Sequence, residues 1–224
     1  MRIRYKKWAR GELEASPFYE DNPETFRGKW KEKFNNDNPI YLELGCGKGG
    51  FISQAATFYD DRNFIAVDMI DAMLGLAKRK VENEYKEKNK VIDNIIITRY
   101  NIENISKIFS KEDNIEGIYI NFCNPWPRGK HNKRRLTHVR QLNQYREFLK
   151  DDGKIYFKTD SDLLFEASLE YFKEAGFELE KVTYDLESEP DFWQNFMTEH
   201  EKMFIDDGLK IKALIARKIK KDEE

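Results

Sequence analysis

At 224 residues, the chain has the length of one domain with a single hydrophobic core. A net charge of −2, with 36% charged residues, excludes a uniformly basic nucleic-acid-binding protein, so a polyanion would have to bind at local basic patches. Two cysteines are too few for a disulfide framework. The sequence has no apolar run near the ~20 residues of a membrane span and no N-terminal signal region, which excludes a membrane protein and a secreted one. These features predict a cytoplasmic protein.

Residues 1–38 are expected to form a basic and aromatic N-terminal arm. The first ten residues contain Arg2, Arg4, Lys6, Lys7 and Arg10 and no acid. A short helix is predicted over residues 23–34, because an asparagine-rich turn and a proline follow it. Such an arm either packs on the domain or reaches toward a ligand, and the sequence leaves both open.

From residue 39 onward, strands and helices alternate. The predicted strands are 39–44, 63–67, 94–99, 117–122, 154–158, 177–184 and 209–218, and the predicted helices are 51–59, 71–89, 105–110, 137–149 and 163–175. This order predicts one α/β domain over residues 39–224, with a doubly wound, mostly parallel seven-stranded sheet. The acidic segment 187–207 is expected to be partly helical, and the helical spacing of its aromatic residues places them in the core.

The first strand leads into a glycine-rich turn at residues 45–50, and such turns bind cofactors at the carboxyl ends of parallel strands. The pattern G-x-G-x-x-G also fits a dinucleotide. Glu43 discriminates, because a pyrophosphate would meet a like charge there, whereas S-adenosylmethionine brings an α-ammonium and a sulfonium. Asp68 can accept hydrogen bonds from ribose hydroxyls, and Asn101 can bind adenine. We therefore favour S-adenosylmethionine, although an N-cap role for Asp68 suits either cofactor.

The fourth strand leads into Asn124-Pro125-Trp126-Pro127 and then a run of cations at 128–135. Two prolines fix φ and remove donors, so Trp126 is held on a stiff loop. An indole beside Arg and Lys suits stacking on a base and binding of phosphate. The Asn124 carbonyl can accept a hydrogen bond from the exocyclic amine of a base. On the loop alone, an equally weighted alternative is that Trp126 covers the core and the cations are merely solvated.

Four motifs together resemble the bacterial tRNA (guanine-N7-)-methyltransferases, which methylate the guanosine at position 46 in the variable loop of tRNA. They are the glycine turn with its strand (residues 41–49), the loop of residues 121–127 with His131 and residues 133–136, the strand end 157–160 and the segment 198–201. The likeness covers nearly the whole chain. It implies a class I methyltransferase with a Rossmann-like fold, which acts in tRNA processing and forms 7-methylguanosine with S-adenosyl-L-methionine.

The resemblance also implies roles for individual residues. The cofactor site would comprise Glu43, Gly45, Gly47, Asp68, Asn101 and Asn124, and Asn124 would also be the catalytic residue. The substrate guanosine would contact Arg128, Asp160, Thr198, Glu199, His200 and Glu201. The tRNA would be bound by Lys130, His131, Lys133, Arg134 and Arg135. Because N7 of guanine has a free lone pair, its methylation needs no strong general base, and positioning would supply most of the rate.

Two positions depart from the family pattern, which usually has Asp at position 124 and Lys at position 128. Asn124 keeps the acceptor but loses the negative charge that would stabilise a cationic methylated base, so the alternative function is a non-catalytic or weakly active tRNA-binding homologue. Arg128 keeps the cation with a different donor geometry. A small-molecule N-methyltransferase is disfavoured by the cationic loop. The three histidines lack metal-ligand spacing, so no metal is expected, and both a monomer and a homodimer remain open.

Overall fold

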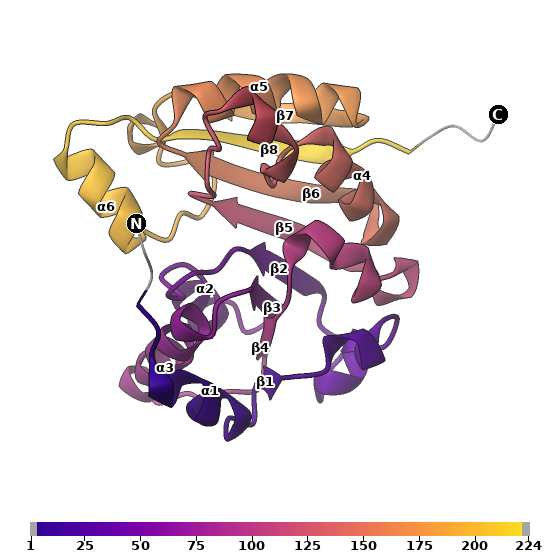
Figure 1. The fold of residues 1–224 in the computed structure, drawn as a ribbon, viewed down its shortest axis with the longest axis vertical. Coiled ribbons are helices and arrows are strands. Elements are labelled where there is room, and N and C mark those ends of the chain that lie inside the picture. The colour runs from indigo at the N-terminus through magenta and orange to yellow at the C-terminus, as the bar shows by residue number, and fades with distance from the viewer. Residues whose placement is uncertain (1–3, 221–224) are drawn as a thin grey trace.

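The computed structural model describes residues 4–220, and its centre is a single mixed β-sheet (Figure 1). The strands are β1 (Tyr19–Glu20), β2 (Ile40–Leu44), β3 (Asn63–Asp68), β4 (Ile95–Arg99), β5 (Ile115–Asn121), β6 (Leu149–Thr159), β7 (Phe177–Thr183) and β8 (Lys212–Lys218). Their order is β1-β4-β3-β2-β5-β6-β8-β7. The first six strands in this order pair in parallel, and β8 is antiparallel to both β6 and β7.

Helices cover both faces of the sheet, as the predicted doubly wound α/β fold requires. The α-helices are α1 (Lys7–Glu14), α2 (Ile52–Phe58), α3 (Asp71–Glu87), α4 (Val139–Phe148), α5 (Asp162–Glu174) and α6 (Glu199–Asp206). The 3-10 helices are η1 (Pro23–Phe26), η2 (Trp30–Lys33), η3 (Ile102–Lys107), η4 (Lys111–Asp113), η5 (Gly129–Arg134) and η6 (Leu186–Ser188). Over residues 4–220, the structure has no helix with the length and apolar character of a membrane span.

The N-terminal arm adds an eighth strand to the seven that the sequence predicts. Its two-residue strand β1 pairs in parallel with β4, and α1 packs on α3 where Gly75 admits it, since a Cβ on Gly75 would meet Ala9 Cβ at 2.9 Å. The expected helix over 23–34 is two 3-10 helices instead, because the Asp113 carboxylate accepts the backbone N–H groups of Gly28 and Trp30. Arg2, part of the predicted basic arm, lies outside the described residues.

Strand β6 begins at Leu149, five residues before the predicted start at Lys154. Asp151, Asp152 and Gly153, which follow the predicted helix 137–149, lie within this strand as an irregularity in its pairing with β5. Asp152 takes a positive φ of 61° there. A bulge of this kind keeps the strand continuous while bending it, and the sequence signal for it is the same as for a turn.

Alternate side chains place two kinds of residue on one face of the central strands. Tyr41, Tyr119 and Tyr156 form an aromatic row across β2, β5 and β6, with ring centroids 6.2 Å and 4.7 Å apart. Two residues further along each strand, the same face carries Glu43, Asn121 and Lys158. We call these three residues the sheet-end row. Side chains alternate between faces, so this row shares a face with the three tyrosines. The row lies at the carboxyl ends of three adjacent parallel strands.

Candidate active site

The glycine turn after β2 lets the chain pass closely between the sheet and α3. Gly45, Gly47 and Gly49 all have positive φ, at 81°, 53° and 76°. At Gly49 a side chain is also excluded by contact, because a Cβ there would lie 2.9 Å from the Cα of Ala77 on α3. The turn therefore needs glycine for both conformation and space.

Glu43 lies at the floor of this cavity with only 2% of its surface exposed. Its Oε1 accepts a hydrogen bond from Nδ2 of Asn121 at 3.0 Å, and its Oε2 is buried without a hydrogen-bond partner among residues 4–220. Burial raises the pKa of Glu43 from 4.5 to about 8, although the Asn121 hydrogen bond, the Lys158 charge and the nearby backbone N–H of Ile52 act in the opposite direction. A buried carboxylate oxygen without a donor is costly, so the site is built to receive a donor or a cation.

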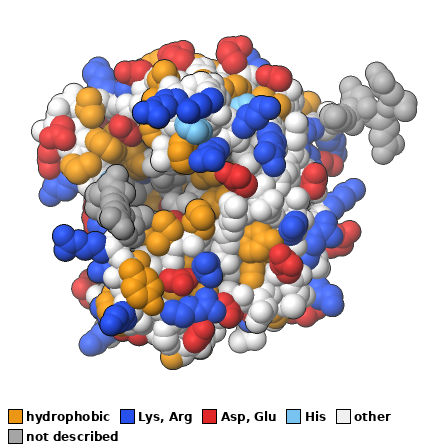
Figure 2. Space-filling model, viewed as in Figure 1, with side chains coloured by type: hydrophobic (Ala, Val, Ile, Leu, Met, Phe, Trp, Pro, Cys, Tyr) orange, Lys and Arg blue, Asp and Glu red, His pale blue; other side chains and the backbone are white. Residues whose placement is uncertain are grey.

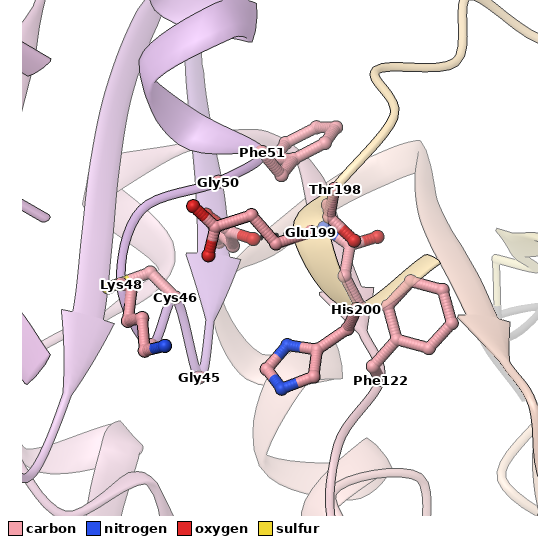
Figure 3. A pocket seen from close by; sticks show the side chains of 12 residues that line it. Gly45, Cys46, Lys48, Gly50, Phe51, Phe122, Thr198, Glu199 and His200 are labelled. Atoms are coloured by element: carbon pink, nitrogen blue, oxygen red, sulfur yellow. Dashed lines mark hydrogen bonds between the residues drawn. The ribbon is translucent and has the colours of Figure 1, made fainter. Parts of the chain in front are cut away.

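A first cavity, of about 600 Å³ including the open solvent at its mouth, lies above Glu43 between the glycine turn and the start of α6 (Figure 3). Its walls include Lys48 and Phe51 from one side and Glu199 and His200 from the other. Figure 3 shows the Glu199 carboxylate and the Lys48 side chain approaching the same space from opposite elements, with the His200 ring below them. The cavity thus combines a buried acid with an exposed mixed-charge entrance.

A second cavity, of about 800 Å³ including the open solvent at its mouth, adjoins the first one. Gly45 and Phe122 line both cavities. The second cavity is also lined by Asp68 and Asn101 and by side chains of the loop after β5. The other loop and wall residues are Met69, Tyr100, Ile102, Glu103, Cys123, Asn124, Trp126, Arg134 and Leu136. Residues predicted to bind ribose, adenine and the reacting group therefore share one cavity, and the shared wall joins it to the cavity over Glu43.

Asp68 is held by two backbone N–H groups. Its Oδ2 accepts from Gly47 and its Oδ1 from Ile70, both at 3.0 Å. Burial raises its pKa above the ordinary value, while these hydrogen bonds act to lower it. The N-cap of α3 is Ile70 and not Asp68, so the N-cap alternative does not apply. Asn101 does act as a cap, accepting from the backbone of Glu103 at the start of η3.

The loop that follows β5, residues 124–135, is called the basic loop here. Asn124 is exposed, and its Oδ1 accepts the backbone N–H of Trp126 at 3.0 Å in an Asx turn. Trp126 has a φ of 42°, which a bulky residue adopts at a cost of about 1–3 kcal/mol. Its ring is half-buried, with the Arg134 guanidinium 5.2 Å and the His131 ring 5.7 Å away. Trp126 is therefore part of a cavity wall and not a lid over the core.

The cations of the basic loop divide into two groups. Arg128, Lys130, Lys133 and Arg134 are exposed. Figure 2 shows Lys, Arg and His side chains gathered above the hollow on this face of the molecule. Arg135 is only 3% exposed and donates to the carbonyl oxygens of Pro125 and Trp126, at 2.9 and 3.3 Å. It braces the loop from inside, so the structure does not place it among the cations available to a polyanion.

The residues of segment 198–201 also lie in two different environments. Thr198, Glu199 and His200 line the first cavity, whereas Glu201 is 1% exposed and points into the protein. Glu201 completes a capping box with Thr198 and forms an ion pair with Lys158 at 2.7 Å. The structure therefore separates Glu201 from the cavity wall that its three neighbours form.

Arg128 and Asp160 line neither cavity. Arg128 is the exposed residue before η5, and Asp160 is partly exposed after β6, where its backbone oxygen accepts from Lys212 Nζ at 3.1 Å. The aromatic residues predicted to be core in the acidic segment do pack inward at Phe192 and Phe196, which are 5% and 7% exposed. Contact of Arg128 and Asp160 with a substrate stays a prediction.

Sequence reasoning placed Lys158 at the end of a strand and in the 157–160 motif, but assigned it no role. The available signal was a lysine that follows Ile155, Tyr156 and Phe157 in an otherwise apolar strand. A lysine at such a position needs buried acceptors, and those come from a segment about forty residues later in the chain.

Comparison with known proteins agrees with this geometry. Residues 37–214 match a family model described as "Putative methyltransferase". The tRNA (guanine-N(7)-)-methyltransferase of Clostridium beijerinckii is 58% identical over 97% of this chain and 99% of that protein. The enzyme of the same name from Acetivibrio thermocellus is 50% identical over 97% of this chain and 100% of that protein.

Solved structures support the fold. The 16S rRNA methyltransferase KamB has a TM-score of 0.58 and 14% identity, covering 97% of this chain and 96% of its own. The aminoglycoside resistance methyltransferase NpmB1 has a TM-score of 0.56 and 17% identity, covering 86% and 98%. These likenesses establish the methyltransferase fold, and the sequence relatives establish the narrower grouping. The chain belongs to the tRNA (guanine-N(7)-)-methyltransferase family.

Proposed function

We propose that this protein transfers a methyl group from S-adenosyl-L-methionine to N7 of a guanine in tRNA, at position 46 of the variable loop. The observation that carries the proposal is Glu43 Oε2, a buried acceptor at the end of β2 that has no hydrogen-bond partner within residues 4–220. Glu43 lines the first cavity, and the basic loop lines the adjoining second one. Membership of the tRNA (guanine-N(7)-)-methyltransferase family supports the same reaction.

The residues present fit S-adenosyl-L-methionine. The free oxygen of Glu43 suits an α-ammonium group, and Gly45 and Gly47 leave room for close approach. Asp68 and Asn101, in the adjoining cavity, suit the ribose hydroxyls and the adenine. When bound, the cofactor supplies an electrophilic methyl group on a sulfonium. A pyrophosphate would meet the Glu43 carboxylate, so a dinucleotide suits this site less well.

The protein's contribution to the reaction is orientation. N7 attacks through an in-plane lone pair, and the reaction removes no proton from the base, so the absence of a strong base beside Asn124 is no obstacle. Asn124 Oδ1 already accepts from Trp126 but has a second lone pair for a base amine. The amide has no charge to offset the positive charge that develops on the base, so in this proposal the carboxylates at the cavity edges supply the negative field.

Contacts with tRNA fall to the exposed part of the basic loop. Arg128, Lys130, His131, Lys133 and Arg134 would bind phosphates, whereas Arg135 would hold the loop in shape. The guanosine would contact Arg128 and Asp160 together with Thr198, Glu199 and His200. Glu201 would contribute indirectly, because its oxygens are already taken by Lys158, Asn195 and the backbone of Thr198. With tRNA as its substrate, the protein would act in the cytoplasm.

The proposal is tested by incubating the protein with methyl-labelled S-adenosyl-L-methionine and unmodified tRNA, followed by nucleoside analysis. Label is expected in 7-methylguanosine, and a tRNA with another base at position 46 should take up none. Label in a different nucleoside would contradict the proposal. The non-catalytic tRNA-binding alternative, which Asn124 raised, is not supported by the relatives, because they carry the name of the enzyme. Binding of tRNA without methyl transfer would reverse that conclusion.

A further inference from the structure

Lys158 is a buried lysine that the proposed reaction does not use. Its side chain is 1% exposed, and Nζ donates to Glu201 Oε2 at 2.7 Å, to Asn195 Oδ1 at 2.7 Å and to the Phe196 carbonyl at 3.2 Å. An ammonium group has three donors, so its hydrogen-bonding capacity is filled. All three acceptors belong to one short segment, residues 195–201, which lies far from β6 in sequence.

That segment forms a wall of the first cavity. Thr198, Glu199 and His200 line it, and Lys158 donates hydrogen bonds to the chain on both sides of these residues. Other contacts hold the segment to α2 and α3. Gln54 Nε2 donates to the Met197 carbonyl at 2.9 Å, and the buried Phe196 ring packs against Phe51, with the two ring centroids 5.7 Å apart. Lys80 pairs with Glu199 at 2.6 Å, but the two side chains are 30% and 60% exposed, and exposed pairs contribute about 0–1 kcal/mol. The buried ion pair is the contact that joins this wall to β6.

Lys158 and Glu43 lie on either side of Asn121 in the sheet-end row. Asn121 is the register partner of Lys158 across β5 and β6, and the same Asn121 donates to Glu43. Two buried acids, Glu43 and Glu201, thus share one buried cation. With all three ionised, the group carries one net negative charge. Among the described residues the free acceptor is Glu43 Oε2, a buried atom of a side chain that lines the cavity. A single cationic ligand group would complete both the charge balance and the hydrogen bonding.

We propose that Lys158 is a positioning residue for the cofactor, which ties the wall of residues 198–200 to the sheet and supplies the buried positive charge that lets Glu43 bind a cationic group. The inference rests on the proposed cofactor. The attraction of Lys158 acts to lower the pKa of Glu43 against the dominant effect of burial, which supports this role. The pKa of Lys158 is itself lowered by burial and held up by Glu201 and Glu43.

Other charged or titratable groups around Glu43 have to be separated from this effect. Asp68 from β3 raises the pKa of Glu43. Cys46 and Lys48 of the glycine turn, and Glu199 and His200 of α6, line the same cavity. Substitution of Lys158 and of Glu201 leaves all of these groups unchanged, so a change in the titration of Glu43 reports on the buried pair.

The experiment compares Lys158→Met and Glu201→Gln with the native protein. The Glu43 carboxyl is titrated by ¹³C NMR without ligand, and binding of S-adenosylhomocysteine is measured by calorimetry from pH 6 to pH 9. We expect Lys158→Met to raise the Glu43 pKa by about one unit and to weaken binding at pH 7 about tenfold. Glu201→Gln should lower the Glu43 pKa, because it removes a carboxylate and leaves the Lys158 charge to Glu43.

Opposite shifts are the signature of charge sharing, since loss of a merely structural contact would not move the titration in opposite directions. Lys158→Arg should keep the native Glu43 titration. Lys154→Met, on the same face of β6 but paired with Glu180, is the matched control and should change nothing. An unchanged Glu43 pKa in both variants, or uniformly weaker binding with an unchanged pH profile, would overturn the inference. If Lys158→Met does not fold, an unchanged Glu43 pKa in Glu201→Gln is enough to overturn the inference. A native protein that fails to bind S-adenosylhomocysteine would refute the proposed cofactor instead.

Discussion

The sheet-end row and the basic loop meet at the same edge of the sheet, but they are built in opposite ways. Glu43 and Lys158 are almost fully buried and held by regular strands, whereas most cations of the basic loop are exposed, on or next to the short 3-10 helix η5. Buried charges interact strongly and are screened little by salt, while exposed charges act through many weak, salt-dependent contacts. The comparison separates a region that selects a small cationic ligand from one that attracts a polyanion.

The largest effect is expected from Glu43→Gln. It keeps the shape of the side chain and an acceptor for Asn121 but removes the negative charge, so cofactor binding should fall by at least ~100-fold, which corresponds to about 2.7 kcal/mol. Calorimetry with S-adenosylhomocysteine checks this, with circular dichroism to confirm the fold. An unchanged affinity would show that the buried charge does not select the ligand.

The same substitution should change how stability depends on pH. Burial raises the Glu43 pKa from 4.5 to about 8, so the folded protein holds this proton more tightly than the unfolded chain. Stability from this group is therefore fully present below about pH 4.5 and is lost as pH rises toward about 8, by up to a few kcal/mol. Denaturant unfolding of the ligand-free protein at several pH values should show a steeper loss in the native protein than in Glu43→Gln. An equal dependence of unfolding free energy on pH in the two proteins would contradict the raised pKa of Glu43.

Within the basic loop, Arg135→Met should act like a core substitution. It leaves the carbonyl groups of Pro125 and Trp126 without their donor, so the free energy of unfolding should fall by about 2 kcal/mol. The salt dependence of tRNA binding should stay the same, because Arg135 is not an exposed cation. If tRNA affinity depended less on salt concentration while stability stayed native, Arg135 would instead belong to the RNA interface.

Lys133→Ala tests the exposed half of the loop. Loss of one phosphate contact should weaken tRNA binding several-fold, by about 1 kcal/mol, and reduce the salt slope by about one. Stability should not change. The matched control is Lys173→Ala, an exposed lysine near the end of α5, at the opposite edge of the sheet. If both variants weaken tRNA binding equally, the basic loop has no special role.

The smallest effect is expected from Asn124→Asp. Asp can keep the Asx turn with Trp126 and adds a charge that stabilises a cationic base, so kcat for methyl transfer should rise by less than about tenfold. Single-turnover methylation of tRNA measures it, with cofactor affinity as the control. A fall in kcat would show that the amide nitrogen of Asn124 has its own role.

Much of the fold could be predicted from local pattern. The alternation of strands and helices predicted a doubly wound sheet, and the glycine turn with Glu43 predicted a cofactor site at the end of β2. The two-residue strand β1 was missed, because it is too short to show a period and exists only through pairing with β4. The early start of β6 was missed because a bulge and a turn use the same residue types.

The sequence by itself determined which chemical groups stand at the strand ends, because parallel strands bring their carboxyl ends to one edge whatever the details of packing. Only the tertiary structure decided that Arg134 faces outward while its neighbour Arg135 is buried, and that Lys158 finds Glu201 across 43 residues. Burial and charge pairing depend on contacts between distant segments, and no periodicity within either segment records them.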